Sequence, residues 1–352
     1  MIAIADSLRT LDAGWFTNAL RDAGHARAAV RAVTCETMAF RGAVADMARV
    51  RIDYDGSAEP GPASVVAKIR GTTEVQVGMD AAMRLYEREA RFYRDLAGEV
   101  PVATPRCYHI GDGTATPLLL EDLGGLRAGD QMLGLAPADA ERLMDVLAGM
   151  HALYWESPVL AQDWLLSPGE GAFAGMVAQL VGSGVEALRA RYADRAPAGV
   201  LDAVTRAAPR WCEILGRCAE GPMTLVHNDC RLDNIFFRAD GDPVLVDWQV
   251  VARTRGTQDV ANLLAGSMDV EDLRASWEPL LRRYHERLRE HGVSDYAWGD
   301  CVLHYRQNIL YPLGAGIALL GHLDIGDDRG LGDAIVLRAL THVADLDSLA
   351  AV

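Results

Sequence analysis

Lysine is almost absent from this sequence. Of its 34 basic residues, one is a lysine, Lys68, and the other 33 (34 − 1) are arginines. The lysine ammonium is a compact point charge, whereas the arginine guanidinium is a wide planar fork. The position that keeps the lysine is therefore a candidate for a tight site of fixed geometry, although chance would also leave one lysine somewhere. The surrounding sequence has to decide between these two interpretations.

Closely paired cysteines are absent as well. Six cysteines are scattered along the chain, and no two of them form a C-x-x-C pair. This distribution excludes the usual spacing of a zinc site and the disulfide framework of a small secreted protein, so we expect reduced thiols. Residues 1–12 lack a basic segment followed by an apolar run, and the sequence therefore predicts no secretory signal and a cytoplasmic location.

The sequence also lacks long apolar runs and excess positive charge. No stretch approaches the roughly 18 uninterrupted apolar residues of a membrane span, and the most apolar region, 309–323, contains Tyr311, Pro312 and His322. The net charge of −15 (34 − 49) argues against nucleic acid or an acidic membrane surface as a partner, because both require basic residues. We therefore expect no nucleic-acid and no membrane partner, and a neutral or cationic ligand is easier to accommodate.

What remains is the composition of an ordinary folded chain. Hydrophobic residues make up 50% and charged residues 24%, which excludes disordered, fibrous and low-complexity proteins. The 352 residues exceed the roughly 150 of a typical domain, so we expect two domains or one two-lobed domain.

The first third of the chain is predicted to be rich in strands. Apolar spacing indicates a helix over about 8–23, and a polar helical segment is expected over about 79–97. Alternating polarity and Gly- or Pro-containing turns predict strands at 30–34, 44–54, 63–70, 105–110 and 117–122.

The remainder of the chain is predicted to be mostly helical. Helical periodicity extends over 137–155, 171–192, 198–220, 270–291, 296–320 and 330–350, with one strand-like interruption at 223–251. The sequence thus predicts an α+β chain with two lobes, 1–123 and 124–352, whose boundary falls in the glycine-rich segment 123–134.

The most specific motif lies in residues 225–237, which read Leu-Val-His-Asn-Asp-Cys-Arg-Leu-Asp-Asn-Ile-Phe-Phe. They contain the pattern H-x-D-x-x-x-x-N, formed by His227, Asp229 and Asn234, and a second apolar strand downstream ends at Asp247. Phosphoryl transfer needs this set, because one Asp takes the proton of the acceptor hydroxyl while an Asn and another Asp hold metal ions. We therefore predict Asp229 as general base and Asn234 and Asp247 as Mg²⁺ ligands.

Together with Lys68 on an upstream strand, these motifs resemble the aminoglycoside phosphotransferase and choline kinase families, the small-molecule relatives of protein kinases. The resemblance covers nearly the whole chain, and the Asp-Trp-Gln triplet that begins at Asp247 is most similar to the ecdysteroid-kinase-like and choline-kinase-like branches. It implies a two-lobed protein-kinase-like fold with an N-terminal antiparallel-sheet lobe, which binds the nucleotide, and a larger helical C-terminal lobe.

The resemblance also implies roles for residues of the first lobe. Lys68 would contact the α- and β-phosphates of the nucleotide and pair with Glu89, with Glu87 in the same helical turn as the competing partner. The segment 118–123, with Glu121 and Leu123, would be the hinge that hydrogen-bonds the adenine.

Two further segments take their interpretation from the resemblance. His227 would order the catalytic loop, and residues 256–261 would pack behind the metal site. The phosphate-covering loop of these families is rich in glycine, whereas residues 40–45 contain one glycine, Gly42. Which backbone amides reach the phosphates therefore stays open.

Each motif residue, taken alone, also has a purely structural interpretation. Asp229 could cap a turn, Asn234 could be a turn residue and Asp247 could end a strand. Five features in the correct order, including the strand lysine and the helix glutamate, favour kinase-like chemistry over coincidence. A separate set on one helix face, His304, Asn308 and Tyr311, could line an acceptor pocket, but core packing is its expected role.

The sequence therefore predicts a kinase that uses ATP or GTP with Mg²⁺ and phosphorylates a hydroxyl group of a small molecule. The alternative is a pseudokinase that binds nucleotide without turnover. A protein kinase is disfavoured, because no Ala-Pro-Glu segment follows Asp247 and the chain reaches Gly256 and Asp259 within a short distance. The acceptor and the oligomeric state stay open.

Overall fold

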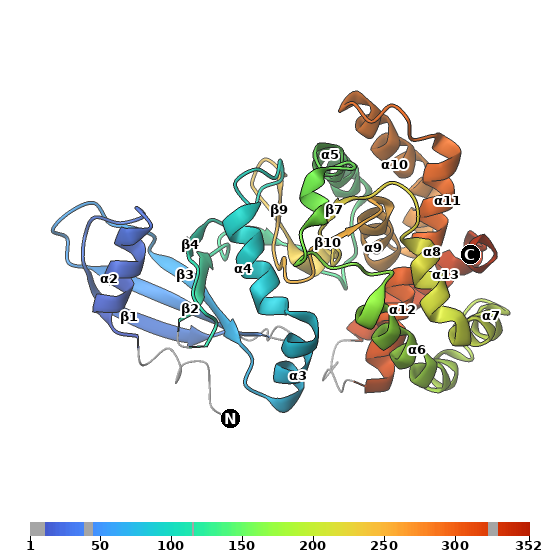
Figure 1. Cartoon of the computed structure of the whole chain (residues 1–352), viewed down its shortest axis with the longest axis horizontal. Coiled ribbons are helices and arrows are strands. Elements are labelled where there is room, and N and C mark those ends of the chain that lie inside the picture. The colour runs from blue at the N-terminus through green and yellow to red at the C-terminus, as the bar shows by residue number, and fades with distance from the viewer. Residues whose placement is uncertain (1–10, 39–44, 115, 323–329) are drawn as a thin grey trace. The chain divides into compact units, whose positions relative to one another are not determined.

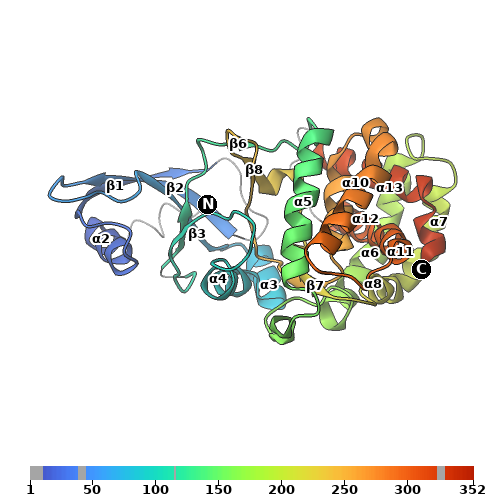
Figure 2. The ribbon, with the colours of Figure 1, turned by 90° about the horizontal axis from the view of Figure 1, so that it is seen from above.

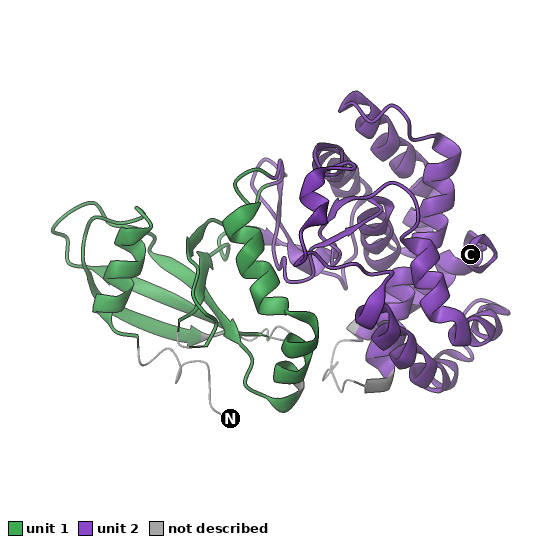
Figure 3. Cartoon of the chain, in the orientation of Figure 1, with its two compact units in different colours: residues 1–99, 103–126 green, residues 100–102, 127–352 purple. Residues whose placement is uncertain are grey.

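The computed structural model describes residues 11–38, 45–114, 116–322 and 330–352. The chain divides into two compact units, one formed by residues 1–99 and 103–126 and the other by residues 100–102 and 127–352 (Figure 3). The first unit ends at residue 126 and omits residues 100–102, whereas the sequence analysis expected one boundary, at residue 123.

The first unit is built on an antiparallel sheet of five strands in the order β1-β2-β3-β5-β4 (Figure 1). The strands are β1 (Val30–Thr37), β2 (Ala45–Tyr54), β3 (Ser64–Arg70), β4 (Cys107–His109) and β5 (Leu118–Glu121). All five predicted strands are present. The antiparallel sheet of the α+β prediction is thus confirmed.

Helix α2 (Ala13–Asp22) covers one face of this sheet. Its Phe16 and Leu20 belong to one apolar core with Val65, Ala67 and Ile69 of β3. Successive side chains of a strand point to opposite faces, so the residues between these three face the other way. Lys68 is among them.

On that opposite side, the helix expected over 79–97 is in fact two helices, α3 (Glu74–Met83) and α4 (Leu85–Asp95). The chain breaks at Arg84, which has the left-handed backbone conformation with φ +52°. The break is stabilised by Asp80, whose carboxylate accepts a hydrogen bond of 2.8 Å from the backbone N–H of Tyr86 in the first turn of α4. Such a capping contact satisfies a backbone donor that has no partner within its own helix.

The second unit is mostly helical, as predicted (Figure 2). Its helices are α5 (Pro137–Leu153), α6 (Gly171–Tyr192), α7 (Val200–Ala207), α8 (Trp211–Cys218), α9 (Thr257–Ser267), α10 (Val270–Glu290), α11 (Trp298–Asn308), α12 (Leu310–His322) and α13 (Leu331–Asp345). Short strands form two small sheets, β10 (Ala252–Thr254) with β7 (Thr224–Val226), and β6 (Arg127–Ala128), β8 (Ile235–Phe237) and β9 (Pro243–Leu245).

Two of the helices predicted for the second unit are interrupted, and proline accounts for both interruptions. The segment 198–220 is split by a 3₁₀ turn, Ala208–Arg210, which contains Pro209. The segment 296–320 is split into α11 and α12, and Pro312 lies in the first turn of α12. A proline ring cannot donate the backbone hydrogen bond of a helix interior, but it is tolerated in a first turn.

Helix α9 was not predicted as a helix, although the sequence analysis expected part of its segment to pack behind the metal site. Every residue from Thr257 to Ser267 is buried, so this helix has no polar face and shows no amphipathic period. It contacts α5, α10, α11, α12 and α13. Helix α9 therefore lies at the centre of the second unit. Its side chains are fixed in position by the helices packed around it.

Among the described residues, helix α6 is long and apolar enough to cross a membrane by length and composition alone, with a mean hydropathy of 1.3 over its best window. Helices of globular domains meet the same criterion. Here α6 packs against α8 and α12, and its Arg191 forms an ion pair of 2.5 Å with Asp333 of α13. These contacts place α6 within the helical packing of the second unit.

Candidate active site

Lys68 lies in the middle of β3 and pairs with Glu89 of α4. The lysine Nζ is 2.6 Å from Oε2 of Glu89, and only 6% and 1% of the two side chains are exposed. Glu89 lies on the buried face of α4 with Leu85 and Phe92. The competing Glu87 instead forms ion pairs with Arg84 and Arg91. The structure therefore places Glu89, and not Glu87, against the lysine.

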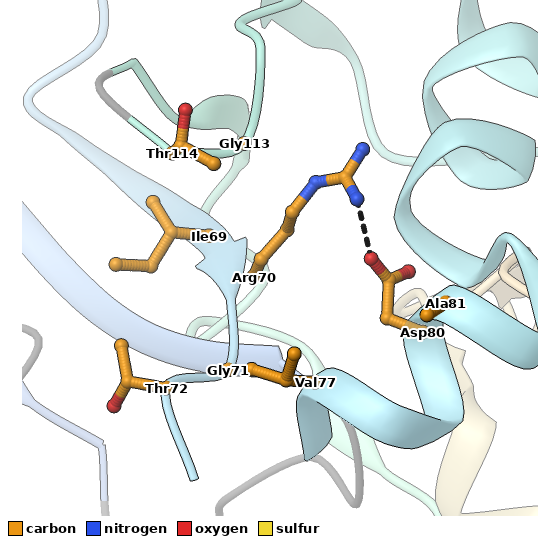
Figure 4. Close-up of a pocket in the computed structure, with 9 residues that line it drawn as sticks. All are labelled: Ile69, Arg70, Gly71, Thr72, Val77, Asp80, Ala81, Gly113 and Thr114. Atoms are coloured by element: carbon orange, nitrogen blue, oxygen red, sulfur yellow. Dashed lines mark hydrogen bonds and ion pairs between the residues drawn. The ribbon is translucent and has the colours of Figure 1, made fainter. Parts of the chain in front are cut away.

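A second ion pair, which the sequence analysis missed, lies next to the first. Arg70, two residues beyond Lys68 on the same face of β3, has Nη1 2.5 Å from Oδ2 of Asp80 (Figure 4). The Arg70 guanidinium also lies 5.2 Å from the ring centroid of Tyr86, and burial raises the pKa of that tyrosine. Because Asp80 caps α4, this pair ties β3 to the start of the helix that carries Glu89.

The Arg70–Asp80 pair opens onto a cavity of about 480 Å³ (Figure 4). Its lining residues are Ile69, Arg70, Gly71, Thr72, Val77, Asp80, Ala81, Gly113 and Thr114. A cavity of this size matches the lower range of small-molecule sites. Arg70 follows Lys68 by two residues on the same strand, which places both side chains on one face of the sheet. This spacing was the one sequence signal that could have drawn attention to Arg70.

The predicted hinge forms strand β5 and the turn after it. The carboxylate of Glu121 accepts a hydrogen bond of 3.0 Å from the backbone N–H of Arg106, and Leu123 is buried. The more firmly held carboxylate is that of Asp122, which was not predicted. It accepts bonds of 2.7 and 3.0 Å from Arg49 and one of 2.7 Å from Ser64.

The surroundings of Asp122 act on its pKa in opposite directions. Burial of the carboxyl works to raise the pKa, but the hydrogen bonds from Arg49 and Ser64 outweigh it, so the pKa lies below its usual range. Asp122 therefore anchors the end of β5 as a carboxylate. Gly42, the predicted phosphate-loop glycine, lies outside the described residues.

In the second unit, the loop of the H-x-D motif is anchored by hydrogen bonds to the buried helix α9. Both carboxylate oxygens of Asp259 accept bonds of 2.7 Å, from the backbone N–H groups of His227 and Asn228. Asn228 has a left-handed φ of +69°, a conformation that Asn tolerates better than most residues. Asp259 thus fixes the backbone immediately before Asp229.

The His227 ring joins this loop to the strand that precedes Asp247. Its Nε2 lies 2.8 Å from the carbonyl of Val246, and its Nδ1 accepts a bond of 3.3 Å from the N–H of Asp229. These partners require the proton on Nε2, because a carbonyl only accepts. The imidazole is fully engaged in holding the two chain segments together.

Asp229 and Asn234 face each other across a single 3₁₀ turn, Leu232–Asn234. The Asn234 amide nitrogen donates to the Asp229 carbonyl and to its Oδ2, both at 2.9 Å. Asn234 is buried, whereas 29% of the Asp229 side chain is exposed. Asp229 is therefore fixed in orientation and still open to an incoming group.

Asp247 follows β9 in a strained conformation, with a left-handed φ of +66°. The backbone N–H of Val246 donates to the carbonyl of Asn234 at 3.0 Å, which brings Asn234 and Asp247 to neighbouring positions. Gln249 donates to Oδ2 of Asp247 at 3.3 Å. A strained backbone conformation persists only where the surrounding structure holds it in place. Such residues are often found at functional sites.

The oxygen atoms of Asp247 and Asn234 are suited to Mg²⁺, which prefers hard oxygen ligands. Among the described residues, no group of three or more His, Cys, Asp or Glu side chains could hold a metal ion.

Arg231 is a residue of this loop that the sequence analysis left without a role. Its Nε lies 3.3 Å from Oδ1 of Asp229, and its Nη1 lies 3.5 Å from Oδ2 of Asp233. The attraction of Asp229 is the largest effect on the Arg231 pKa and raises it, with Asp233 and Asp247 acting in the same direction.

The helix-face set has packing partners in the core. The fully buried Asn308 donates to the carbonyl of Cys218 at 3.0 Å and accepts from Thr257 at 2.7 Å. His304 lies 3.0 Å from the hydroxyl of Tyr296, and burial, followed by the charge of Arg255, lowers its pKa to about 4. The contacts of these two residues agree with the core-packing role expected for the set.

Comparison with a family model places most of the chain in one known group. The model of the ecdysteroid kinase-like family matches residues 41–293, a span that includes both the strand lysine and the H-x-D loop. The comparison with curated proteins returns no match.

Solved structures with a similar fold cover nearly the whole chain. An aminopropanol kinase associated with a microcompartment shares 15% identity, with coverage of 94% of this chain and 96% of its own and a TM-score of 0.54. An ethanolamine kinase of Plasmodium vivax shares 12%, with coverage of 90% and 81% and a TM-score of 0.52. A spectinomycin phosphotransferase in complex with ADP and spectinomycin shares 12%, with coverage of 96% and 98% and a TM-score of 0.52. At these identities the likeness shows the fold, and the predicted kinase-like architecture is confirmed.

Proposed function

The chain belongs to the ecdysteroid kinase-like family, and from this premise we propose that it transfers the γ-phosphoryl group of ATP or GTP to a hydroxyl group of a small molecule. The observation that carries the proposal is the Asp229–Asn234 arrangement. A carboxylate is held by an amide at 2.9 Å on a loop fixed by the buried Asp259, and it keeps part of its surface exposed. Positioning of this kind is what phosphoryl transfer requires of a protein.

In this proposal Asp229 orients the acceptor hydroxyl and takes its proton, and His227 keeps the loop in place. Asn234 and Asp247 would hold Mg²⁺ through their side-chain oxygens, and the bound metal would supply positive charge to the nucleotide phosphates. The strained backbone of Asp247 and its backbone connection to Asn234 support this assignment.

The nucleotide is assigned to the first unit. Lys68 contacts the α- and β-phosphates, and Glu89 holds the lysine side chain extended from β3. The adenine takes hydrogen bonds from the hinge at Glu121 and Leu123. The ADP bound by the spectinomycin phosphotransferase supports an adenine nucleotide, and GTP is the alternative to test.

The acceptor is proposed by chemical class. The proteins of similar fold are described as acting on ethanolamine, aminopropanol and spectinomycin, which are all hydroxyl compounds. A net charge of −15 is compatible with a cationic acceptor of this kind. We propose a small hydroxyl compound as the substrate, without nucleic acid or a membrane as partner and with a cytoplasmic location.

A panel of acceptors tests this proposal. The protein is incubated with Mg²⁺ and either ATP or GTP, and with amino alcohols, aminoglycosides, macrolides, choline-like amines or sterols. Nucleotide consumption is measured beside the mass of the phosphorylated product. The expected result is acceptor-dependent consumption with a product heavier by one phosphoryl group. Nucleotide binding without product from any acceptor would instead identify a pseudokinase.

A further inference from the structure

Arg231 is surrounded by the carboxylates of the proposed catalytic loop. It pairs with Asp229 at 3.3 Å and Asp233 at 3.5 Å, and the charge of Asp247 also acts on it. It is therefore a fixed positive charge in contact with the proposed base and under the influence of the proposed metal ligand. About a quarter of its side chain, 27%, is exposed.

These contacts are long for arginine pairs in this chain. Arg49 approaches Asp122 to 2.7 Å, Arg274 approaches Asp345 to 2.7 Å, and charge-assisted hydrogen bonds usually lie near 2.7–2.9 Å. Within the described part of the chain, the ion-pair contacts of Arg231 use Nε and Nη1, so Nη2 is available to a further acceptor. Arg231 is thus held in place mainly by charge.

The local charge balance indicates what that acceptor is. Three carboxylates and one guanidinium sum to −2 (−3 + 1), and this environment repels a nucleotide phosphate unless cations oppose it. Mg²⁺ held by Asn234 and Asp247 supplies one source of positive charge in the proposed function. Arg231 supplies another, beside Asp229, where the acceptor oxygen meets the phosphorus atom.

We propose that Arg231 is a further catalytic residue, whose guanidinium donates hydrogen bonds to a non-bridging oxygen of the transferred phosphoryl group. This inference rests on the proposed kinase function. The planar fork of arginine suits phosphate oxygens, and a fixed cation costs no reorganisation when charge develops on them.

The step itself is ordinary phosphoryl transfer. The acceptor oxygen forms a bond to the γ-phosphorus, and the bond from phosphorus to the β–γ bridging oxygen breaks. Its electron pair stays on the departing nucleoside diphosphate, and the acceptor proton passes to Asp229. Arg231 forms no covalent bond and stabilises the charge on the phosphoryl oxygens as they move.

A purely structural role for Arg231 makes different predictions. If the arginine served only to hold Asp229 and Asp233, its loss would loosen the loop, and an added small guanidinium ion would not restore the loop. A catalytic guanidinium, in contrast, acts through its charge and its N–H groups. Both can be supplied by a free guanidinium ion in the space left by a truncated side chain.

The experiment compares Arg231→Ala and Arg231→Lys with Arg210→Ala in the full-length protein, using the best acceptor of the panel. Arg210 is a matched control, since its ion pair with Glu213 is exposed on the surface of the same unit. We measure kcat, the acceptor KM, the Kd of MgATP and the melting temperature. Each variant is also assayed with millimolar guanidinium chloride, well below denaturing concentrations.

For Arg231→Ala we expect kcat to fall about 10² to 10³-fold, the range seen when one donor to a developing oxyanion is removed, with a much smaller change in Kd. Arg231→Lys keeps the charge but loses the fork, so it should retain more activity. Added guanidinium should raise the kcat of Arg231→Ala and leave that of Arg210→Ala unchanged.

Three outcomes would overturn the inference while the proposed function stands. They are a kcat of Arg231→Ala within about twofold of the parent, a loss confined to MgATP affinity, and a lowered kcat that guanidinium does not restore. If Arg231→Ala is unfolded, Arg231→Gln takes its place in the guanidinium comparison: a kcat that guanidinium raises supports the inference, and a lowered kcat that guanidinium leaves unchanged overturns it. A parent protein that phosphorylates no acceptor refutes the proposed function, and the inference with it.

Discussion

The predicted site residues of the two units differ in how far their charged side chains are exposed to solvent. The Lys68–Glu89 pair of the first unit is almost closed to solvent, with 6% and 1% of the side chains exposed. Asp229 of the second unit is 29% exposed and is held by hydrogen bonds from a buried frame. A buried pair fixes a helix against a strand, whereas a partly open carboxylate can receive a substrate. In the proposed function, the difference separates a pair that binds and orients the nucleotide from a carboxylate that meets the acceptor.

The largest expected effect is on the metal ligand of the second unit. Asp247→Ala should lower turnover by about 10³ or more, because a metal supplies several kcal/mol of charge stabilisation at a transferring phosphoryl group. EDTA should abolish turnover of the parent. Steady-state kinetics across a Mg²⁺ titration measures both. Parent-like Mg²⁺-dependent activity in Asp247→Ala would show that the metal site lies elsewhere.

The buried pair of the first unit should respond in stability as well as activity. Glu89→Ala leaves the Lys68 ammonium buried without its carboxylate, which typically costs roughly 3–5 kcal/mol, so the free energy of unfolding should drop by that order. Urea denaturation measures this change in the free energy of unfolding.

Lys68→Arg keeps the charge with a wider head group and should impair MgATP affinity or turnover. Parent-like stability of Glu89→Ala together with parent-like activity of Lys68→Arg would contradict the proposed role of the Lys68–Glu89 pair.

The second pair of the first unit should have a smaller effect. Asp80→Asn keeps the shape but loses the ion pair with the partly exposed Arg70, while its amide oxygen can still accept from Tyr86. We expect a loss of about 1 kcal/mol or less, because exposed pairs are weak. Asp80→Ala also removes the cap of α4 and should cost about 1 kcal/mol more. Equal stabilities for these two variants would show that the cap contributes nothing.

The smallest effect at neutral pH is expected for the buried histidines of the second unit. Burial lowers the pKa of His342 to about 4, below the usual 6.5, so the unfolded chain binds more protons between these values. His342 therefore contributes to the free energy of unfolding above pH 6.5, and this contribution is lost as the pH falls towards 4. His342→Gln should flatten this part of the stability profile relative to the parent. An unchanged slope between pH 4 and 6.5 would contradict the shift.

Much of the fold could be predicted from the sequence, because its signals are local. Alternating polarity identified the strands of the first unit, and the spacing of His227, Asp229 and Asn234 identified the loop. The buried helix α9 was not recognised, because a helix without a polar face has no period. The break at Arg84 depends on a side chain, Asp80, whose capping contact has no marked sequence pattern.

The sequence analysis named the motif residues and two of the residues that hold them, Glu89 and His227, but it missed the other supporting contacts. Lys68 and Asp229 stand in recognisable patterns of neighbours. The partners Arg70–Asp80 and Arg49–Asp122 come together only through strand register and helix packing, over separations that no local pattern records. Arg231 was visible in the motif, but its role depends on the distances to the carboxylates around it.

The most direct test of the central claim compares the parent with Asp229→Asn, in binding and in turnover. The amide keeps the shape of the carboxylate but cannot take a proton. We expect kcat for the best acceptor to fall by about 10² to 10⁴, the usual contribution of a general base, while the Kd of MgATP measured by calorimetry changes little. Equal turnover in parent and variant, or a loss of MgATP binding as severe as that of Lys68→Ala, would contradict the assignment of Asp229 as the catalytic base.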